Sequence, residues 1–285
     1  LAGAGFAVLM SSSWCDVLFG GLLSLVVYAI VFIAGRLQWV ASMLEPLAAL
    51  TVAVLANGLA LAAPGSNPFI VTMCALIVLV PGFGLVLGLG ELSVNHMVSG
   101  ASRLLGAIVV TCKLFFGAAI GALIAEGLWS IPAVVKPLAP SPFWTWVFLA
   151  FLLMGLSMVF QVRPRDIFLP LMVGLLTWGG VMLGNTVGYW QGSFLGAFMM
   201  VVLANSVAKW AHRPASVILL PCVLILVPGA AAYRGLSLFS NHGIVAGLEA
   251  ETKVFLIACA IIGGLLVGNV VVSPKQPRKK AQDRG

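Results

Sequence analysis

Two stretches of the chain break in the same way. Leu79–His96 reads LVPGFGLVLGLGELSVNH, and Leu226–His242 reads LVPGAAAYRGLSLFSNH, 147 residues later. Each stretch interrupts an apolar run with Val-Pro-Gly and ends on Asn-His. Proline removes a backbone donor and clashes with the preceding helical turn. We therefore predict a helix that is interrupted at the same place in each half of the chain.

The amino-acid composition predicts the class to which the whole protein belongs. Hydrophobic residues make up 61% of the 285, charged residues only 8%, and the mean hydropathy is +1.14. A soluble domain carries about 25% charged residues, because its core needs a polar cover. The fold class is therefore an all-α polytopic membrane protein. The five scattered cysteines and the absence of hydrolase, metalloprotease or nucleotide-loop patterns predict no enzyme, no metal and no cofactor.

Apolar windows of about 20 residues predict ten transmembrane helices. They cover residues 1–10 (the end of a truncated first helix), 17–35, 43–62, 69–88, 102–126, 143–161, 168–187, 192–210, 215–233 and 254–272. We therefore divide the chain into a first five-helix repeat at 1–130, a proline-rich connection at 131–142, a second five-helix repeat at 143–273 and a basic tail at 274–285.

An odd number of helices in each half has a topological consequence. A shift of about 147 residues superposes helices one to five on six to ten, so the two halves enter the membrane from opposite sides. The result is an inverted repeat, which recurs in secondary transporters with a substrate site near the midplane. Broken helices are tolerated at membrane depth only inside the protein or beside a water-filled cavity. Simple packing kinks are the alternative explanation of the two breaks.

The positive charges orient the chain. With the C-terminal tail in the cytoplasm of a cell-membrane protein, eleven Lys and Arg residues fall on the inner side and only three on the outer side. The basic tail is typical of a topology signal or of a lipid contact, and we expect no nucleic-acid partner. The outer charges are Lys136, Arg234 and Lys253.

Four stretches resemble the threonine/serine exporter family, which includes the related two-component succinate exporters. They are AGAGFAVLM (2–10), SWCDVLFGGLL (13–23), LVPGFGLVLGLGELSVNHMVSGASRLLGA (79–107) and LVPGAAAYRGL (226–236). The family pattern places Ser-Gly-x-x-Arg after the first break, here Ser99, Gly100 and Arg103. The resemblance implies proton-driven export of small hydrophilic metabolites by ten helices. Succinate-type dicarboxylate export, and a channel-like or structural membrane subunit, stay open as alternatives.

The resemblance also bears on partners. It implies a small-molecule substrate (an amino acid or a dicarboxylate), protons and the lipid bilayer. Members often carry a soluble cytoplasmic segment before the first helix, so we expect an upstream domain before Leu1. The sequence allows a homo-oligomer and does not decide between oligomeric states.

Ionisable and polar residues near the breaks are the candidate site. Arg103 with the nearby hydroxyl of Ser99 suits a carboxylate, and Lys113 in the middle of an apolar run could attract one. Glu91 and His96 could carry protons. The predicted substrate-binding residues are Pro81, Gly82, Asn95, Ser99, Arg103, Lys113, Pro228, Gly229, Arg234 and Asn241, and the predicted proton-coupling residues are Glu91, His96 and His242.

Structural roles compete with each of these assignments. Lys113 could extend to the interface or pair with a glutamate, Arg103 could be an anchor, and His96 could be ordinary interfacial polarity. Asp16 and Glu45 fall at helix starts, where a carboxylate complements the helix dipole. Asn185 and Asn205 lie in apolar runs and could join helices by hydrogen bonds.

Overall fold

The computed structural model describes residues 1–10, 13–63, 65–93, 95–129, 141–226, 235 and 244–273. These residues form helices and turns, with no strand among them. Six helical segments within these ranges are long and apolar enough to cross a membrane, which together with the composition makes this a multi-span membrane protein. They are Trp14–Ala34, Leu44–Ala62, Met97–Leu128, Pro164–Asn185, Tyr189–Ala211 and Ile244–Val271.

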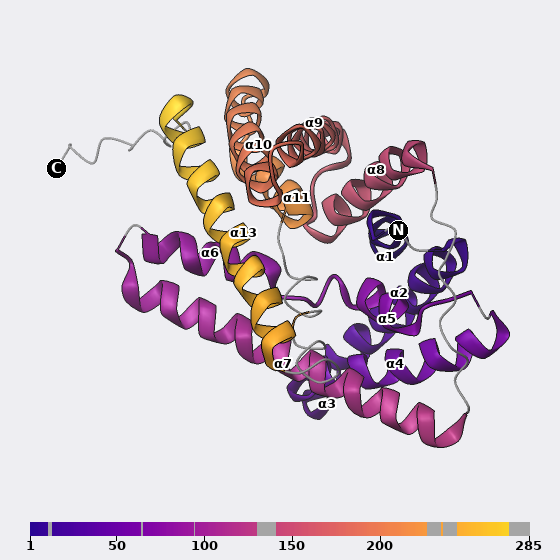
Figure 1. Ribbon diagram of the computed structural model, residues 1–285. Helices are drawn as coiled ribbons and strands as arrows, with labels where there is room; N and C mark the ends of the chain where they lie inside the picture. The colour runs from indigo at the N-terminus through magenta and orange to yellow at the C-terminus, as the bar shows by residue number, and fades with distance from the viewer. Residues whose placement is uncertain are drawn as a thin grey trace. The chain divides into compact units, whose positions relative to one another are not determined.

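The chain divides into two compact units. The first comprises Leu1–Gln161 and Val227–Cys259. Its helices are α1 (Ala2–Leu9), α2 (Trp14–Ala34), α3 (Gln38–Ser42), α4 (Leu44–Ala62), α5 (Pro68–Leu76), α6 (Gly82–Ser93), α7 (Met97–Leu128) and α8 (Pro142–Val159). The long α7 lies against α4 along one half and against α6 along the other (Figure 1). Small and β-branched residues such as Val52, Ala56 and Val71 fill the core of this unit.

The second unit comprises Val162–Leu226 and Ala260–Gly285. It contains a 3₁₀ turn, η1 (Pro164–Asp166), and the helices α9 (Phe168–Asn185), α10 (Tyr189–Ala211) and α11 (Ala215–Leu226), which pack on one another (Figure 1). The helix α13 (Ile244–Val271) contributes its residues up to Cys259 to the first unit and the rest to the second.

Local sequence explains where several helices begin. Ser13 and Asp16 form a reciprocal capping box at the start of α2, and the Asn67 side chain caps α5 just before Pro68 at its first position. The carboxylate of Glu45 lies in the first turn of α4. The prediction that Asp16 and Glu45 lie at helix starts is therefore confirmed.

Several predicted boundaries differ from the structure. The span predicted at 102–126 is part of a longer helix, α7, because the polar residues before it continue the helix instead of forming a loop. Residues 244–253, predicted as an outer loop, are the first turns of α13, since no proline or glycine pair interrupts them. The short helix α3 was not predicted. The basic tail and residues 131–140 of the connection lie outside the described residues.

Candidate functional site

The first Val-Pro-Gly break separates two helices in the structure. α5 ends at Leu76, residues 77–79 form a turn followed by a bend at Val80, and α6 begins at Gly82. The hydrogen bonding changes at the break: Gly82 N–H donates at 2.8 Å to the Val80 carbonyl, only two residues back. Leu85 N–H donates to the Pro81 carbonyl at 3.1 Å and begins the regular helical ladder of α6. Pro81 itself has no N–H to donate. The helix is therefore discontinuous here, as the sequence predicts.

A tight turn joins α6 to α7 and holds several predicted site residues. Asn95 has a left-handed backbone with φ of 65°, and His96 is the residue that precedes α7. Ser99 Oγ donates a long hydrogen bond of 3.5 Å to the His96 carbonyl. All three side chains are exposed. The structure therefore gathers three of the predicted residues at one accessible turn.

The closest charged pair of the described chain links α6 to α7. Arg103 Nε lies 2.8 Å from Glu91 Oε1, and the two side chains are 53% and 21% exposed. The second carboxylate oxygen, Oε2 of Glu91, is buried and accepts no hydrogen bond. Gly88 and Gly100 allow this approach, because a methyl group on Gly100 would lie only 2.8 Å from the Gly88 carbonyl oxygen. A predicted substrate ligand and a predicted proton carrier are thus paired with each other.

Lys113 lies apart from this cluster. Ten residues separate it from Arg103 along α7, or about 15 Å of helix rise. Its ammonium lies 3.7 Å from Glu45 Oε2 on α4, so the structure supports the alternative that Lys113 pairs with a glutamate. Gly117 of α7 contacts Pro46 of α4, and Gly121 contacts Leu50, so the two helices run in the same direction. Lys113, four residues before Gly117, is therefore level with the first turn of α4.

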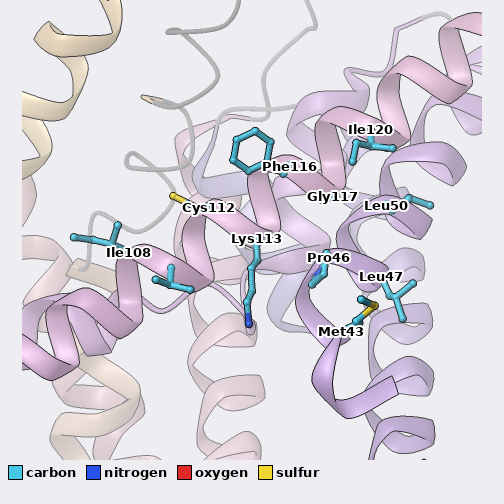
Figure 2. A pocket seen from close by; sticks show the side chains of 11 residues that line it. Met43, Pro46, Leu47, Leu50, Ile108, Cys112, Lys113, Phe116, Gly117 and Ile120 are labelled. Atoms are coloured by element: carbon cyan, nitrogen blue, oxygen red, sulfur yellow. The ribbon is translucent and has the colours of Figure 1, made fainter. Parts of the chain in front are cut away.

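A cavity of about 470 Å³ opens beside Lys113, between α4 and α7 (Figure 2). Apart from Lys113, its lining residues are aliphatic, aromatic or sulfur-containing, or are glycine or proline. Such a lining offers a hydrophilic metabolite almost no hydrogen-bonding partner.

The most extensively hydrogen-bonded carboxylate of the described chain was not proposed as a site residue. Asp16 is wholly buried. Its Oδ1 accepts from Ser66 Oγ at 2.9 Å and from Asn67 N–H at 2.8 Å, and its Oδ2 accepts from Ser13 N–H at 3.0 Å. The Ser-x-x-Asp spacing is a local capping signal, but it cannot show the partners at 66 and 67.

The second unit has its own polar contacts. Asn205 on α10 donates to Asn269 Oδ1 on α13 at 3.0 Å and to the Val272 carbonyl at 2.6 Å, so its predicted role in joining helices is confirmed. Arg213 Nε lies 3.1 Å from Asp166 Oδ1 and ties η1 to the end of α10. The predicted residues of the second break, Pro228, Gly229, Arg234, Asn241 and His242, lie outside the described residues.

Comparison with known proteins agrees with this description of the chain. Residues 1–125 match one family model of threonine/serine exporters, and residues 145–271 match a second. Two relatives are both called pheromone-regulated membrane protein 10. This chain is 28% identical to the Yarrowia lipolytica protein over 190 residues and 25% identical to the Saccharomyces cerevisiae strain S288c protein over 196 residues. These matches cover 60% and 65% of this chain.

The chain spans only 15% of the length of the Yarrowia relative and 48% of the length of the Saccharomyces relative. No solved structure matches the chain. Together the two family models leave only residues 126–144 and 272–285 unmatched. This multi-span membrane protein therefore belongs to the threonine/serine exporter family.

Proposed function

We propose that the protein is a secondary active transporter that exports small hydrophilic metabolites of the threonine/serine type across the cell membrane in exchange for protons. The observation that carries this proposal is the discontinuous α5–α6 helix. A helix interrupted within an apolar chain is tolerated where the free backbone groups face protein or a water-filled cavity, and transporters build substrate sites from such ends. Family membership supports the same conclusion.

An inverted repeat is part of the proposal, and the contact between α1 and α8 supports it. Gly5 packs against Leu152, where a methyl group on the glycine would lie 2.7 Å from the leucine Cβ. Residue 152 is the counterpart of residue 5 under the 147-residue shift. Gly155 packs against Leu1 and Ala2, so the two helices run antiparallel. When a twofold axis passes through a contact, a residue at the axis touches its own counterpart in the other half.

A second pair of equivalent contacts supports the repeat within each unit. Gly117 and Gly121 of α7 pack against the backbone of α4 at Pro46 and Leu50. Shifted by 147, these glycines become Gly264 and Gly268 of α13, which pack against α10 near Phe194 and Phe198. The repeat thus extends from the sequence motif to the close contacts between helices, and we propose halves at 1–130 and 143–273, joined by 131–142.

Within this proposal the α6–α7 hairpin supplies the working residues of the first half. Arg103 would bind the substrate carboxylate, and the Ser99 hydroxyl and Asn95 would add polar contacts at the accessible turn. Glu91, with one buried oxygen free, would exchange its arginine partner for a proton as substrate binds. His96 would relay protons to solvent. The residues of the second break would take the matching roles in the other half.

The test is transport into inside-out membrane vesicles with labelled threonine, serine and succinate. One pH unit, acidic inside, holds about 1.4 kcal/mol and can drive about ten-fold accumulation at one proton per substrate. We expect gradient-dependent uptake of threonine and serine that a protonophore abolishes. Uptake of succinate alone would favour the dicarboxylate alternative, and uptake indifferent to the gradient would rule out proton coupling.

A further inference from the structure

The groove between α4 and α7 has a shape that the proposed transport function does not explain. The two helices approach most closely at Gly117 and Gly121, where the α7 backbone lies directly on α4. Larger side chains stand on both sides of this contact, among them Leu47, Leu50, Phe116 and Ile120, and they enclose the cavity of about 470 Å³ (Figure 2). Phe116 and Ile120 remain 62% and 49% exposed, so the groove opens outward.

The lining excludes a hydrophilic occupant. A polar molecule entering the groove would lose its hydration and would find one charged partner, Lys113, among apolar walls. Both flanking helices are long and apolar enough to cross a membrane. The occupant that matches such walls in a bilayer is therefore a hydrocarbon chain.

One end of the groove, in contrast, favours an anion. The Lys113 side chain is 44% exposed and extends away from Phe116 and Ile120, toward the end where Met43 lies (Figure 2). Its contact with Glu45 is long, at 3.7 Å, and an ammonium has three donors, so donors remain available. Met43 gives α4 no side-chain cap, and Pro46 has no N–H, so the N–H groups of Leu44 and Glu45 remain as donors in the helix turn that carries the Glu45 partner of Lys113.

We propose that this groove is a binding site for a membrane phospholipid with an anionic headgroup. One acyl chain lies between Leu47 and Leu50 of α4 and Phe116 and Ile120 of α7. The phosphate lies at Lys113 and the first turn of α4, where it competes with the Glu45 carboxylate for the ammonium. The site accounts for a lysine in the middle of an apolar helix without assigning it to the exported substrate.

The acyl-chain part is tested by photo-crosslinking in nanodiscs, with a phosphatidylglycerol that carries a diazirine on one chain. Peptide mapping should place the label on residues 43–50 and 108–120. Leu50→Trp and, independently, Leu47→Trp should reduce this labelling several-fold, because indole fills the groove. Leu105→Trp is the matched control: it lies on α7, 62% exposed and outside the lining, and should leave labelling unchanged. Even labelling along α7 would overturn the proposal.

The headgroup part is tested by comparing this probe with a phosphatidylcholine that carries the same diazirine chain. One basic residue near the surface corresponds to about a five-fold preference for an anionic lipid. Lys113→Gln should remove that preference, Lys113→Arg should keep it, and Glu45→Gln should increase it. Equal labelling by the two lipids in the unaltered protein would overturn the headgroup assignment. Disulfide formation between Ile120→Cys copies, with loss of lipid label, would assign the groove to a second copy instead.

Discussion

At the scale of single residues, Asp16 is the most consequential carboxylate that the structure describes. It joins the first turns of α2 and α5 through hydrogen bonds from Ser13, Ser66 and Asn67. α5 is the helix that leads to the break, so the position of the break relative to α2 depends on this buried group. A residue that looks like an ordinary cap thus also fixes a contact between segments 50 residues apart.

We predict that Asp16→Ala lowers the free energy of unfolding by about 3 kcal/mol, because it leaves buried donors without an acceptor. The measurement is equilibrium unfolding in detergent. Glu45→Ala is the control, since it removes a first-turn carboxylate with a single long ion pair and should cost less than about 1 kcal/mol. Equal losses for the two variants would contradict this role of Asp16.

The pair of Glu91 and Arg103 allows a separation of stability from transport. A pair this exposed contributes only about 0–1 kcal/mol to stability, so Glu91→Gln should leave unfolding nearly unchanged. If Glu91 carries the proton, uptake driven by the pH gradient should fall at least about ten-fold, equivalent to about 1.4 kcal/mol of barrier. The swap of Glu91→Arg with Arg103→Glu should preserve the ion pair without restoring transport. Restored transport would show that the Glu91–Arg103 ion pair has a structural role only and does not carry the proton.

At the scale of helices, close contacts at glycine determine which elements pair. A methyl group on Gly121 would lie 2.9 Å from the Ala53 Cβ and even closer to the Leu50 carbonyl oxygen. Gly106, on the same helix, has no neighbour of that kind within 4 Å. The α4–α7 contact is therefore specific to one face of α7, although glycines occur on others.

This contrast predicts opposite signs for the same substitution on one helix. Gly121→Ala should destabilise the protein by about 1–3 kcal/mol, since the close backbone contact must open. Gly106→Ala should stabilise it by about 0.5–1 kcal/mol through helix propensity alone. Unfolding measured in one detergent compares the two directly. A stabilising Gly121→Ala would mean that α4 and α7 do not approach as described.

The break between α5 and α6 is the element that transport should need most. Pro81→Ala restores a backbone donor and lets α5 continue toward α6, so we predict a transport rate at least about ten-fold lower with unfolding changed by less than about 1 kcal/mol. Pro214→Ala is a matched control, because Pro214 precedes the start of α11 and lies outside the break. Unaltered transport by Pro81→Ala would remove the discontinuous helix from the mechanism.

At the scale of the whole molecule, the inverted repeat makes a topological prediction. In a variant without the native cysteines, Arg36→Cys and Arg165→Cys should react with a membrane-impermeant maleimide only from the cytoplasmic side. Val187→Cys, which is 76% exposed between α9 and α10, should react only from the outside. Labelling of intact cells and of inside-out vesicles provides the comparison. Reaction of all three from one side would exclude opposite orientations of the halves.

The sequence alone determined the class, the helical fold and the first break. These follow from local chemistry. An apolar composition indicates that lipid surrounds the protein, a backbone in lipid forms helices to satisfy its hydrogen bonds, and proline interrupts a helix. The family also followed from short motifs in the chain, and both family models bear it out. Helix boundaries were less predictable, since α13 begins ten residues before its predicted start and no strong helix breaker lies between.

Only the tertiary structure decided the partners. Glu91 pairs with Arg103, Lys113 with Glu45, and Asp16 with Ser66 and Asn67. Each choice depends on which helix faces meet and in what register, and register is set by the glycine contacts that let backbones approach. From the sequence one can predict that a charged residue in an apolar segment needs a partner. Which partner it finds depends on residues far along the chain that the fold brings within a few ångströms.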